Sequence, residues 1–361
     1  MLRIALLSLC LALTASAKNA KNVILFLGDA GGIATLNAAS LLGHGEPQKL
    51  YIQSMPHIGL SDTSTASNWV SDSAAGMTAI VTGQKTHNGV ISQGPDAVRG
   101  KSDGATLKTI LEYAEEKGLS TGVITNMTFT DATPAATYAH ANNRRDFARI
   151  FHDLLNPSYG DGVDVLIGPG RSAVDKDLAE KNQPSIAAAM QQAQRPLYES
   201  LEAIPTDARR AIMIVENRDQ FSLKDAVDRA ITMLSKNRKG FFLMVEGDMH
   251  TSKVEDGLRR ALLLDDTIRA TANRGLKNTL ILFTADHSFD LRIAGGEHGK
   301  PLLDGEEGYQ KDGSYRGKAI RMEDDHTGEE VVVAAQGPGS ERVHGYMPNT
   351  QIFNIMMQAF G

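Results

Sequence analysis

Residues 241–258 read FFLMVEGDMHTSKVEDGL, and this stretch changes character halfway along. Phe241 to Val245 form an unbroken apolar run, which predicts a strand buried inside a sheet. Glu246, Asp248 and His250 then follow within five residues. Carboxylates and imidazoles are the side chains that bind Zn²⁺ and Mg²⁺, so the stretch predicts metal ligands at the end of a core strand.

On both sides of this strand, apolar runs alternate with helical patterns. Such alternation indicates an α/β fold in which helices sandwich a large central, mostly parallel sheet. Segment 294–325, rich in Gly, Asp, Lys and Glu, is expected to be a long surface loop or small excursion. The other expected strands are 23–27, 121–125, 163–168, 279–286 and 330–339. The expected helices are 106–118, 185–194, 222–237, one ending near 274, and 349–360.

Polar residues cluster where the predicted strands end. Asp29, Glu246, Asp286 and His287 each follow an apolar run, and ligands of such folds bind beyond the carboxyl ends of the strands. A lone carboxylate there is more often a turn or N-cap residue. Three such ends, two of them with a histidine, instead favour a metal site, and His326 is a further candidate.

The segment VSDSAAGMTAIVTG (70–83) places Asp72 and Ser73 at the start of a small-residue helix. The serine hydroxyl there can be an N-cap and nothing more. The alternative is a nucleophile stabilised by a metal and by the helix N-terminus. Because no histidine adjoins Ser73 in the sequence, a metal would have to activate it.

The segment TDATPAATYAHANNR (130–144) carries Asp131, Thr133 and Arg144, which a turn and one helix could present together. Arginine suits bidentate contact with a phosphate group. The plainer interpretation is a capped helix with Pro134 in its first turn and a surface arginine.

The chain has 361 residues, 42% of them hydrophobic and 22% charged, enough for one large α/β domain or two ordinary ones. Its net charge of −6 argues against a nucleic-acid partner. Arg3, a short apolar core and a small-residue site ending at Ala17 predict a signal peptide over residues 1–17, without a membrane anchor after cleavage. We therefore expect a periplasmic or secreted protein whose mature chain lacks Cys10, its one cysteine.

Six stretches, in order along the chain, resemble the bacterial alkaline phosphatase family. They are NVILFLGDAGG, DSAAGMTAIVTGQKTHNGVI, TDATPAATYAHANNR, SLKDAVDRAITMLSKNRKGFFLMVEG, LFTADHS and HTGEEVVVAAQGPGS. The resemblance spans nearly all of residues 18–361 and implies a single catalytic domain and a homodimer. It also implies that Ser73 takes up the phosphoryl group, that Asp72 orients it, and that Arg144 holds two phosphate oxygens.

The resemblance further implies two zinc ions and one magnesium ion. Two metals about 4 Å apart stabilise the attacking and leaving oxygens of a phosphoryl transfer. The zinc beside the serine would be held by Asp29, Asp286 and His287, the other zinc by His326, and the magnesium by Asp29, Thr133 and Glu246 with Asp131 close to it.

The chain departs from the family pattern after Glu246. The family has Asp and His four residues apart as ligands of the first zinc, and Thr251 and Glu255 stand at those positions here. Either this zinc is lost, or Asp248 and His250 replace the usual ligands, which is the interpretation we favour. Alternatively, Asp248 caps the next helix while His250 packs or faces solvent, or Glu255 is itself a ligand.

The sequence thus predicts a phosphate monoester hydrolase that works through a covalent phosphoserine. A phosphodiesterase of the same superfamily with the same metals is one alternative, and a catalytically impaired phosphate- or metal-binding protein is another. A sulfatase is disfavoured, because the region of Ser73 lacks the Cys/Ser-x-Pro-x-Arg pattern of that class.

Overall fold

The computed structural model describes residues 19–303 and 308–361. The predicted signal peptide, with its cleavage point after Ala17, lies outside these residues. Within them, no helix combines the length and apolar character needed to cross a bilayer.

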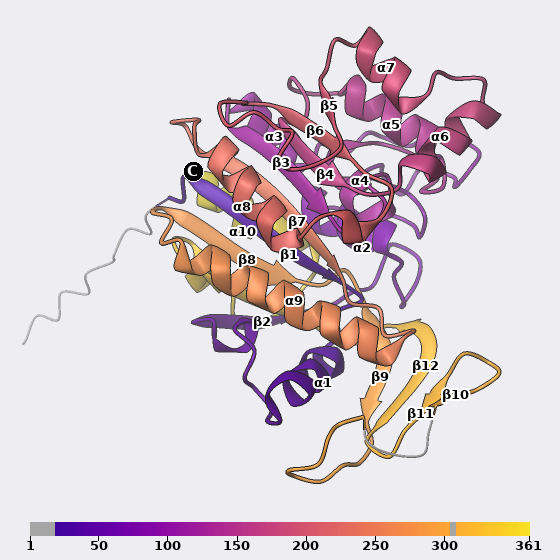
Figure 1. The fold of residues 1–361 in the computed structure, drawn as a ribbon, viewed down its shortest axis with the longest axis vertical. Coiled ribbons are helices and arrows are strands. Elements are labelled where there is room, and N and C mark those ends of the chain that lie inside the picture. The colour runs from indigo at the N-terminus through magenta and orange to yellow at the C-terminus, as the bar shows by residue number, and fades with distance from the viewer. Residues whose placement is uncertain (1–18, 304–307) are drawn as a thin grey trace, which may run out of the picture.

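A ten-stranded sheet forms the centre of the molecule, in the order β14-β2-β13-β8-β1-β7-β3-β4-β6-β5 (Figure 1). β13 runs antiparallel to both of its neighbours and the other nine strands share one direction. The expected α/β class with a mostly parallel sheet is therefore confirmed. The strands of this sheet are β1 (Asn22–Asp29), β2 (His57–Ser61), β3 (Ser120–Thr125), β4 (Val165–Gly168), β5 (Leu197–Tyr198), β6 (Ala211–Ile214), β7 (Phe241–Asp248), β8 (Thr279–Thr284), β13 (Val331–Gln336) and β14 (Gly345–Met347).

Helices cover both faces of this sheet because its central strands are apolar on both sides. Along β1, Val23 and Leu25 belong to one hydrophobic core, and Ile24 and Phe26 to the other. The α-helices are α1 (Ile33–His44), α2 (Ser73–Thr82), α3 (Ile110–Glu116), α4 (Ala132–Tyr138), α5 (Phe147–Leu155), α6 (Arg171–Glu180), α7 (Ile186–Gln192), α8 (Leu223–Leu234), α9 (Val254–Asn273) and α10 (Thr350–Phe360). Short 3₁₀ turns are η1 (Ile52–Ser54), η2 (Arg218–Gln220) and η3 (Ser340–Arg342).

Segment 294–325 is an excursion rather than a plain loop, because most of a second, antiparallel sheet is built there. Its order is β10-β11-β12-β9, and it projects from one end of the molecule (Figure 1). Its strands are β9 (Ser288–Ile293), β10 (Gly308–Tyr309), β11 (Tyr315–Arg316) and β12 (Ile320–Thr327). β9 and β12 place His287 and His326 at the junction of the two sheets, since Thr327 pairs with Ser288.

The register of the central strands brings their polar ends together. Asp29 at the end of β1 pairs with Asp248 at the end of β7. Glu246 of β7 pairs with Thr125 of β3 on its other side. Because neighbouring parallel strands end at the same edge, residues more than 200 positions apart meet at one place.

Candidate active site

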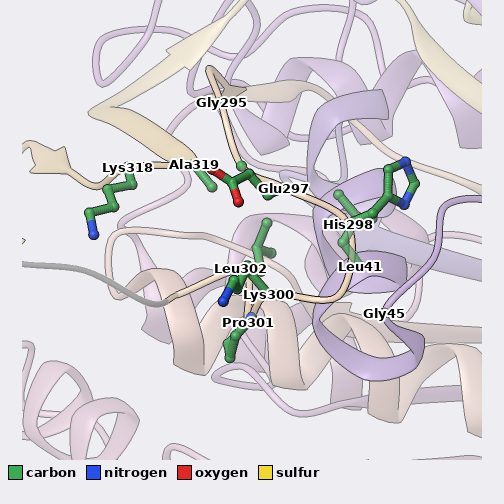
Figure 2. Close-up of a pocket in the computed structure, with 11 residues that line it drawn as sticks. Leu41, Gly45, Gly295, Glu297, His298, Lys300, Pro301, Leu302, Lys318 and Ala319 are labelled. Carbon is green, nitrogen blue, oxygen red and sulfur yellow. The ribbon is translucent and has the colours of Figure 1, made fainter.

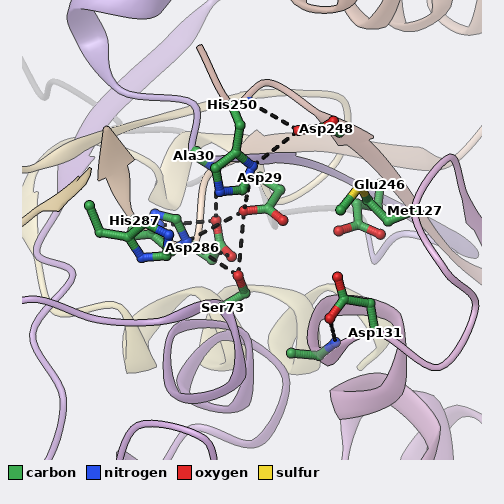
Figure 3. Close-up of polar contacts among 12 residues, drawn as sticks. Asp29, Ala30, Ser73, Met127, Asp131, Glu246, Asp248, His250, Asp286 and His287 are labelled. Atoms are coloured by element: carbon green, nitrogen blue, oxygen red, sulfur yellow. Dashed lines mark hydrogen bonds and ion pairs between the residues drawn. The ribbon is translucent and has the colours of Figure 1, made fainter. Parts of the chain in front are cut away.

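Ser73 is the first residue of α2 and is almost completely buried. Asp72 is the N-cap, and its Oδ1 accepts a hydrogen bond of 3.1 Å from the backbone N–H of Ala75. Capping by Asp72 leaves the serine hydroxyl free to turn toward the strand ends. Ser73 Oγ lies 3.2 Å from His287 Nε2 and 3.5 Å from Asp29 Oδ1 (Figure 3).

Asp29, Asp286 and His287 form one group whose ligand atoms lie within 4.8 Å of one another. The turn after β1 shapes it, since Ala30 adopts a positive φ of 64° and its N–H donates to Asp286 Oδ1 at 3.2 Å. A non-glycine residue in this left-handed region is uncommon and is often found where a site requires one particular backbone geometry.

The carboxylates at the strand ends are too close and too buried to be stable as anions on their own. Burial first, and then the charge of Asp286, raises the pKa of Asp29 well above its usual range. Burial and the neighbouring Asp29 do the same to the pKa of Glu246. A bound cation would offset this repulsion and keep the carboxylates ionised.

The donor atoms of these residues fit metal ions. Among the described residues, Glu246 Oε1, Thr133 Oγ1 and Asp286 Oδ2 are buried without a hydrogen-bond partner. Buried polar atoms are normally paired, so unpaired oxygens on these three predicted ligands fit the chemistry of cation sites. Thr125 Oγ1 donates to the other oxygen of Glu246 and thereby orients it.

Two histidines of the site expose the same ring nitrogen. His287 Nδ1 lies 3.0 Å from the carbonyl oxygen of Ser288, and His326 Nδ1 lies 3.0 Å from that of Ser71. A carbonyl oxygen can only accept a hydrogen bond, so Nδ1 carries the proton and donates, which leaves Nε2 with a lone pair. The two rings stack at a centroid distance of 3.7 Å. Burial also lowers the pKa of His287 to about 4, so this ring is neutral near pH 7.

Arg144 lies between two carboxylates. Its guanidinium donates to Asp72 Oδ2 at 3.1 Å and to Asp131 Oδ1 at 3.0 Å. The expectation that a turn and one helix present Asp131, Thr133 and Arg144 together is wrong for Arg144, because α4 ends at Tyr138. Arg144 sits in the following loop, where its backbone N–H donates to the Gly89 carbonyl. A loop, and not a helix, places Arg144 against Asp72, the residue before Ser73.

His250, His287 and His326 form the second group of candidate metal ligands. Asp248 belongs to neither group found among the described residues. Its carboxylate pairs with Arg218 Nη1 at 2.7 Å and with Arg260 Nε at 3.2 Å. Although burial opposes it, the hydrogen bond from His250 and the charge of Arg260 hold the pKa of Asp248 below its usual range.

The sequence left two other roles open in this segment, Asp248 as a helix cap and Glu255 as a metal ligand. α9 begins at Val254 with Lys253 as its N-cap, so Asp248 does not cap it. Glu255 forms an exposed ion pair with Arg259, which turns it away from the site. Thr251, at the position of the family's aspartate, is buried with an unpaired hydroxyl oxygen. Arg218, Arg260 and Thr125 were not predicted, because nothing local in the sequence shows where their side chains end.

A separate cavity of about 500 Å³ lies between the end of α1 and the second sheet (Figure 2). Its lining includes His298, Lys300 and Lys318. None of the predicted site residues lines it, so this hollow is distinct from the centre around Ser73.

A family model described as alkaline phosphatase matches residues 20–221 and 205–312. The tissue-nonspecific alkaline phosphatase isozyme of Mus musculus is 26% identical over 443 residues, which is 94% of this chain and 83% of that protein. Alkaline phosphatase 4 of Bacillus subtilis is 26% identical over 413 residues, covering 94% of this chain and 88% of that one.

Solved structures show the same likeness. Alkaline phosphatase from the Antarctic bacterium TAB5 matches with a TM-score of 0.78 at 25% identity, over 95% of this chain and 98% of that chain. A mutant of that enzyme with Mg bound in its M3 site matches with the same score at 26% identity, over 95% of this chain and 99% of that chain. Thermus thermophilus alkaline phosphatase, at 20% identity, a TM-score of 0.77 and coverage of 95% and 91%, shares the fold.

Proposed function

The chain belongs to the alkaline phosphatase family, as its sequence stretches indicated, and we propose that it hydrolyses phosphate monoesters through a covalent phosphoserine on Ser73. Family and fold support phosphoesterase activity. The observation that carries the finer proposal is the position of Ser73 Oγ, beside His287 Nε2 and Asp29 at the start of α2.

The chain's own residues divide the work as follows. The Ser73 oxygen attacks phosphorus, the ester P–O bond breaks and the alcohol leaves; water then cleaves the phosphoserine, releasing phosphate and free Ser73. The positive N-terminus of α2 stabilises charge at the serine oxygen. Arg144 holds two oxygens of the phosphoryl group, with Asp72 and Asp131 fixing the plane of its guanidinium. Phosphoryl transfer depends mainly on position and charge neutralisation, so a preformed arginine clamp lowers the barrier without reorganising.

Three metal positions complete the proposal. Asp29, Asp286 and His287 would hold one zinc ion beside Ser73. Glu246 and Thr133 would hold Mg²⁺ with Asp29, and Asp131 lies close by as an outer partner. His326 and His250 would hold the other zinc. Bound metals would supply Lewis acidity toward the serine oxygen and the leaving oxygen.

We also propose that residues 18–361 form one catalytic domain that works as a homodimer in the periplasm or outside the cell. Loss of residues 1–17 on export, read by mass spectrometry of the mature N-terminus, tests the processing. Sedimentation of the mature protein tests the dimer.

Trapping of the phosphoenzyme tests the mechanism. The zinc- and magnesium-loaded protein, quenched in acid after exposure to labelled phosphate ester, should carry label on Ser73. Ser73→Ala should carry none. Ser71→Ala, which removes a buried hydroxyl two residues away that donates to the Asp72 carbonyl, is the matched control and should stay labelled. Label that survives Ser73→Ala would refute the phosphoserine.

Substrate class is tested by comparing chromogenic monoesters and diesters on the same preparation. The proposal requires kcat/KM for the monoester to exceed that for the diester. The reverse order would make the protein a phosphodiesterase. Tight phosphate binding with near-zero turnover of both would make it a binding protein.

A further inference from the structure

Asp248 has no oxygen free for a metal. Its Oδ1 accepts from the backbone N–H of His250 at 3.0 Å and lies 3.0 Å from His250 Nδ1. Its Oδ2 accepts from Arg218 at 2.7 Å and faces Arg260 at 3.2 Å. An ionised carboxylate has about four lone-pair directions. Three of them have a donor here, and the Arg260 cation lies against Oδ2 beside the fourth. The side chain is also only 7% exposed, so water does not compete for these contacts.

Two cations hold this carboxylate and the turn around it in place. Arg260 of α9 donates to the backbone carbonyls of Asp248 at 3.0 Å and His250 at 2.8 Å. α9 also lies directly against the turn, since a methyl group at Gly257 would run into the carbonyl oxygen of His250. The turn is thus fixed at both ends, and the Asp248 charge is already balanced within the protein.

His250 repeats the arrangement of its two neighbours. His287 and His326 each have Nδ1 against a carbonyl oxygen, and His250 has Nδ1 against Asp248 Oδ1. When the carboxylate accepts a hydrogen bond from Nδ1–H, Nε2 is left as the metal-binding nitrogen. The three residues have ligand nitrogens within 4.8 Å of one another. His287 also belongs to the group beside Ser73, which leaves His250 and His326 for the first zinc.

We propose that Asp248 is a positioning residue for His250 and not a ligand, and that the first zinc site of this chain is made of imidazoles without a carboxylate of its own. The proposal deepens the metal assignment made above and rests on it. Asp29, whose Oδ1 lies 3.8 Å from His250 Nδ1, already belongs to the group beside Ser73.

This ligand set has consequences for metal binding. The group of Asp29, Asp286 and His287 offers two negative charges, whereas His250 and His326 offer none. The imidazole site should therefore bind zinc more weakly than its neighbour and should discriminate more strongly against Mg²⁺, since imidazole suits Zn²⁺, Ni²⁺ and Cu²⁺ while carboxylate suits Mg²⁺.

Zinc release from the loaded full-length protein tests the proposal. Zinc per chain is measured after equilibration with increasing pyridine-2,6-dicarboxylate. The native protein should lose zinc in two steps, and His250→Ala should remove the first, weaker step. Asp248→Asn, which keeps an oxygen for the His250 proton, should keep both steps within about tenfold of native affinity. Asp248→Ala should lower the zinc affinity of the site that empties first by about 10- to 100-fold, as loss of a residue that orients a ligand does.

The control is Asp265→Asn, the same change at a buried acid that accepts from the N–H groups of Tyr51 and Ile52 and pairs with Arg269. It should leave both steps unchanged. Loss of a whole zinc equivalent in Asp248→Asn, or native release in a single step, would overturn the proposal. Because zinc release needs no turnover, a protein with these steps but no monoesterase activity would refute the proposed function alone.

Discussion

Gly76 sets how closely the helix of the nucleophile approaches the end of β8. It lies in the first turn of α2, and a methyl group there would sit 2.5 Å from the carbonyl oxygen of Asp286. Ordinary contact begins near 3.4 Å, so Gly76→Ala must separate α2 from this backbone by about 0.9 Å. The obstacle is a backbone atom, which cannot rotate away as a side chain can.

The cost should fall on catalysis more than on stability. Overpacking costs about 1–3 kcal/mol, and replacing a helical glycine by alanine returns about 1 kcal/mol. We therefore expect a loss of about 0–2 kcal/mol in the free energy of unfolding. Displacing Ser73 by nearly 1 Å from His287 should lower kcat/KM by about 100-fold.

Hydrolysis of p-nitrophenyl phosphate and thermal melting measure the two effects. Gly43→Ala is the matched control, because a methyl group there meets the Cδ2 atom of Leu262 at 2.6 Å, the end of a flexible, half-buried side chain. That variant should keep native kcat/KM. If Gly76→Ala also stays within about threefold of native kcat/KM, the contact does not position the serine and the reasoning is refuted.

Three further changes test other parts of the site and fold. Arg144→Ala should lower kcat/KM for a monoester by about 100-fold, because it removes two charge-assisted hydrogen bonds, while the exposed neighbour Arg145→Ala should leave it unchanged. Mg²⁺ at 100 times its Kd should raise native stability by about 2.7 kcal/mol, and Glu246→Gln should abolish this rise in a melting assay. Burial raises the pKa of Glu115 to about 7, so its carboxyl keeps a proton in the fold after the unfolded chain has lost it. The free energy of unfolding should therefore fall as pH rises from about 4.5 to 7, by up to about 3 kcal/mol. In urea titrations, the free energy of unfolding of Glu115→Gln should depend less on pH.

Much of the fold was predictable because its central strands are buried on both faces. An unbroken apolar run such as 241–245 is typical of a strand with helices on both sides, and its end marks the edge where ligands gather. The site residues Asp29, Asp286 and His287 came from that rule together with the family resemblance. Their convergence needs only that parallel strands be in register, which the pairing of Leu27 with Glu246 satisfies.

The second sheet was missed because β10 and β11 have only two residues each and because β12 is largely polar. β12 alternates buried Ile320 and Met322 with exposed neighbours, but charged residues follow and hide the pattern. The helix expected from 106 starts only at Ile110, where Thr109 provides a capping box with Glu112. The start of α3 is therefore set by this capping box and not by the helix propensity of residues 106–109.

The ion pairs of Asp248 with two arginines could not be predicted from residues 246–250 alone. The two cations that pair with it come from η2, thirty residues earlier, and from α9, twelve residues later. Spacing within 246–250 shows that three ligand types are close, but not which of them already has a partner. Only tertiary structure separates a metal ligand from a carboxylate whose charge the protein has balanced.

The charge of the site then explains why its metals and its substrate must be coupled. Asp29, Glu246 and Asp286 are buried acids, and Arg144, which pairs with the residue before Ser73, is already shared between two further carboxylates. Without bound metal, a phosphate dianion entering this centre would meet no net positive charge. Attraction for phosphate therefore has to come from bound metal ions. With the roles that we propose for Asp248 and His250, the altered loop at 248–250 would act on phosphate affinity through the occupancy of one metal site.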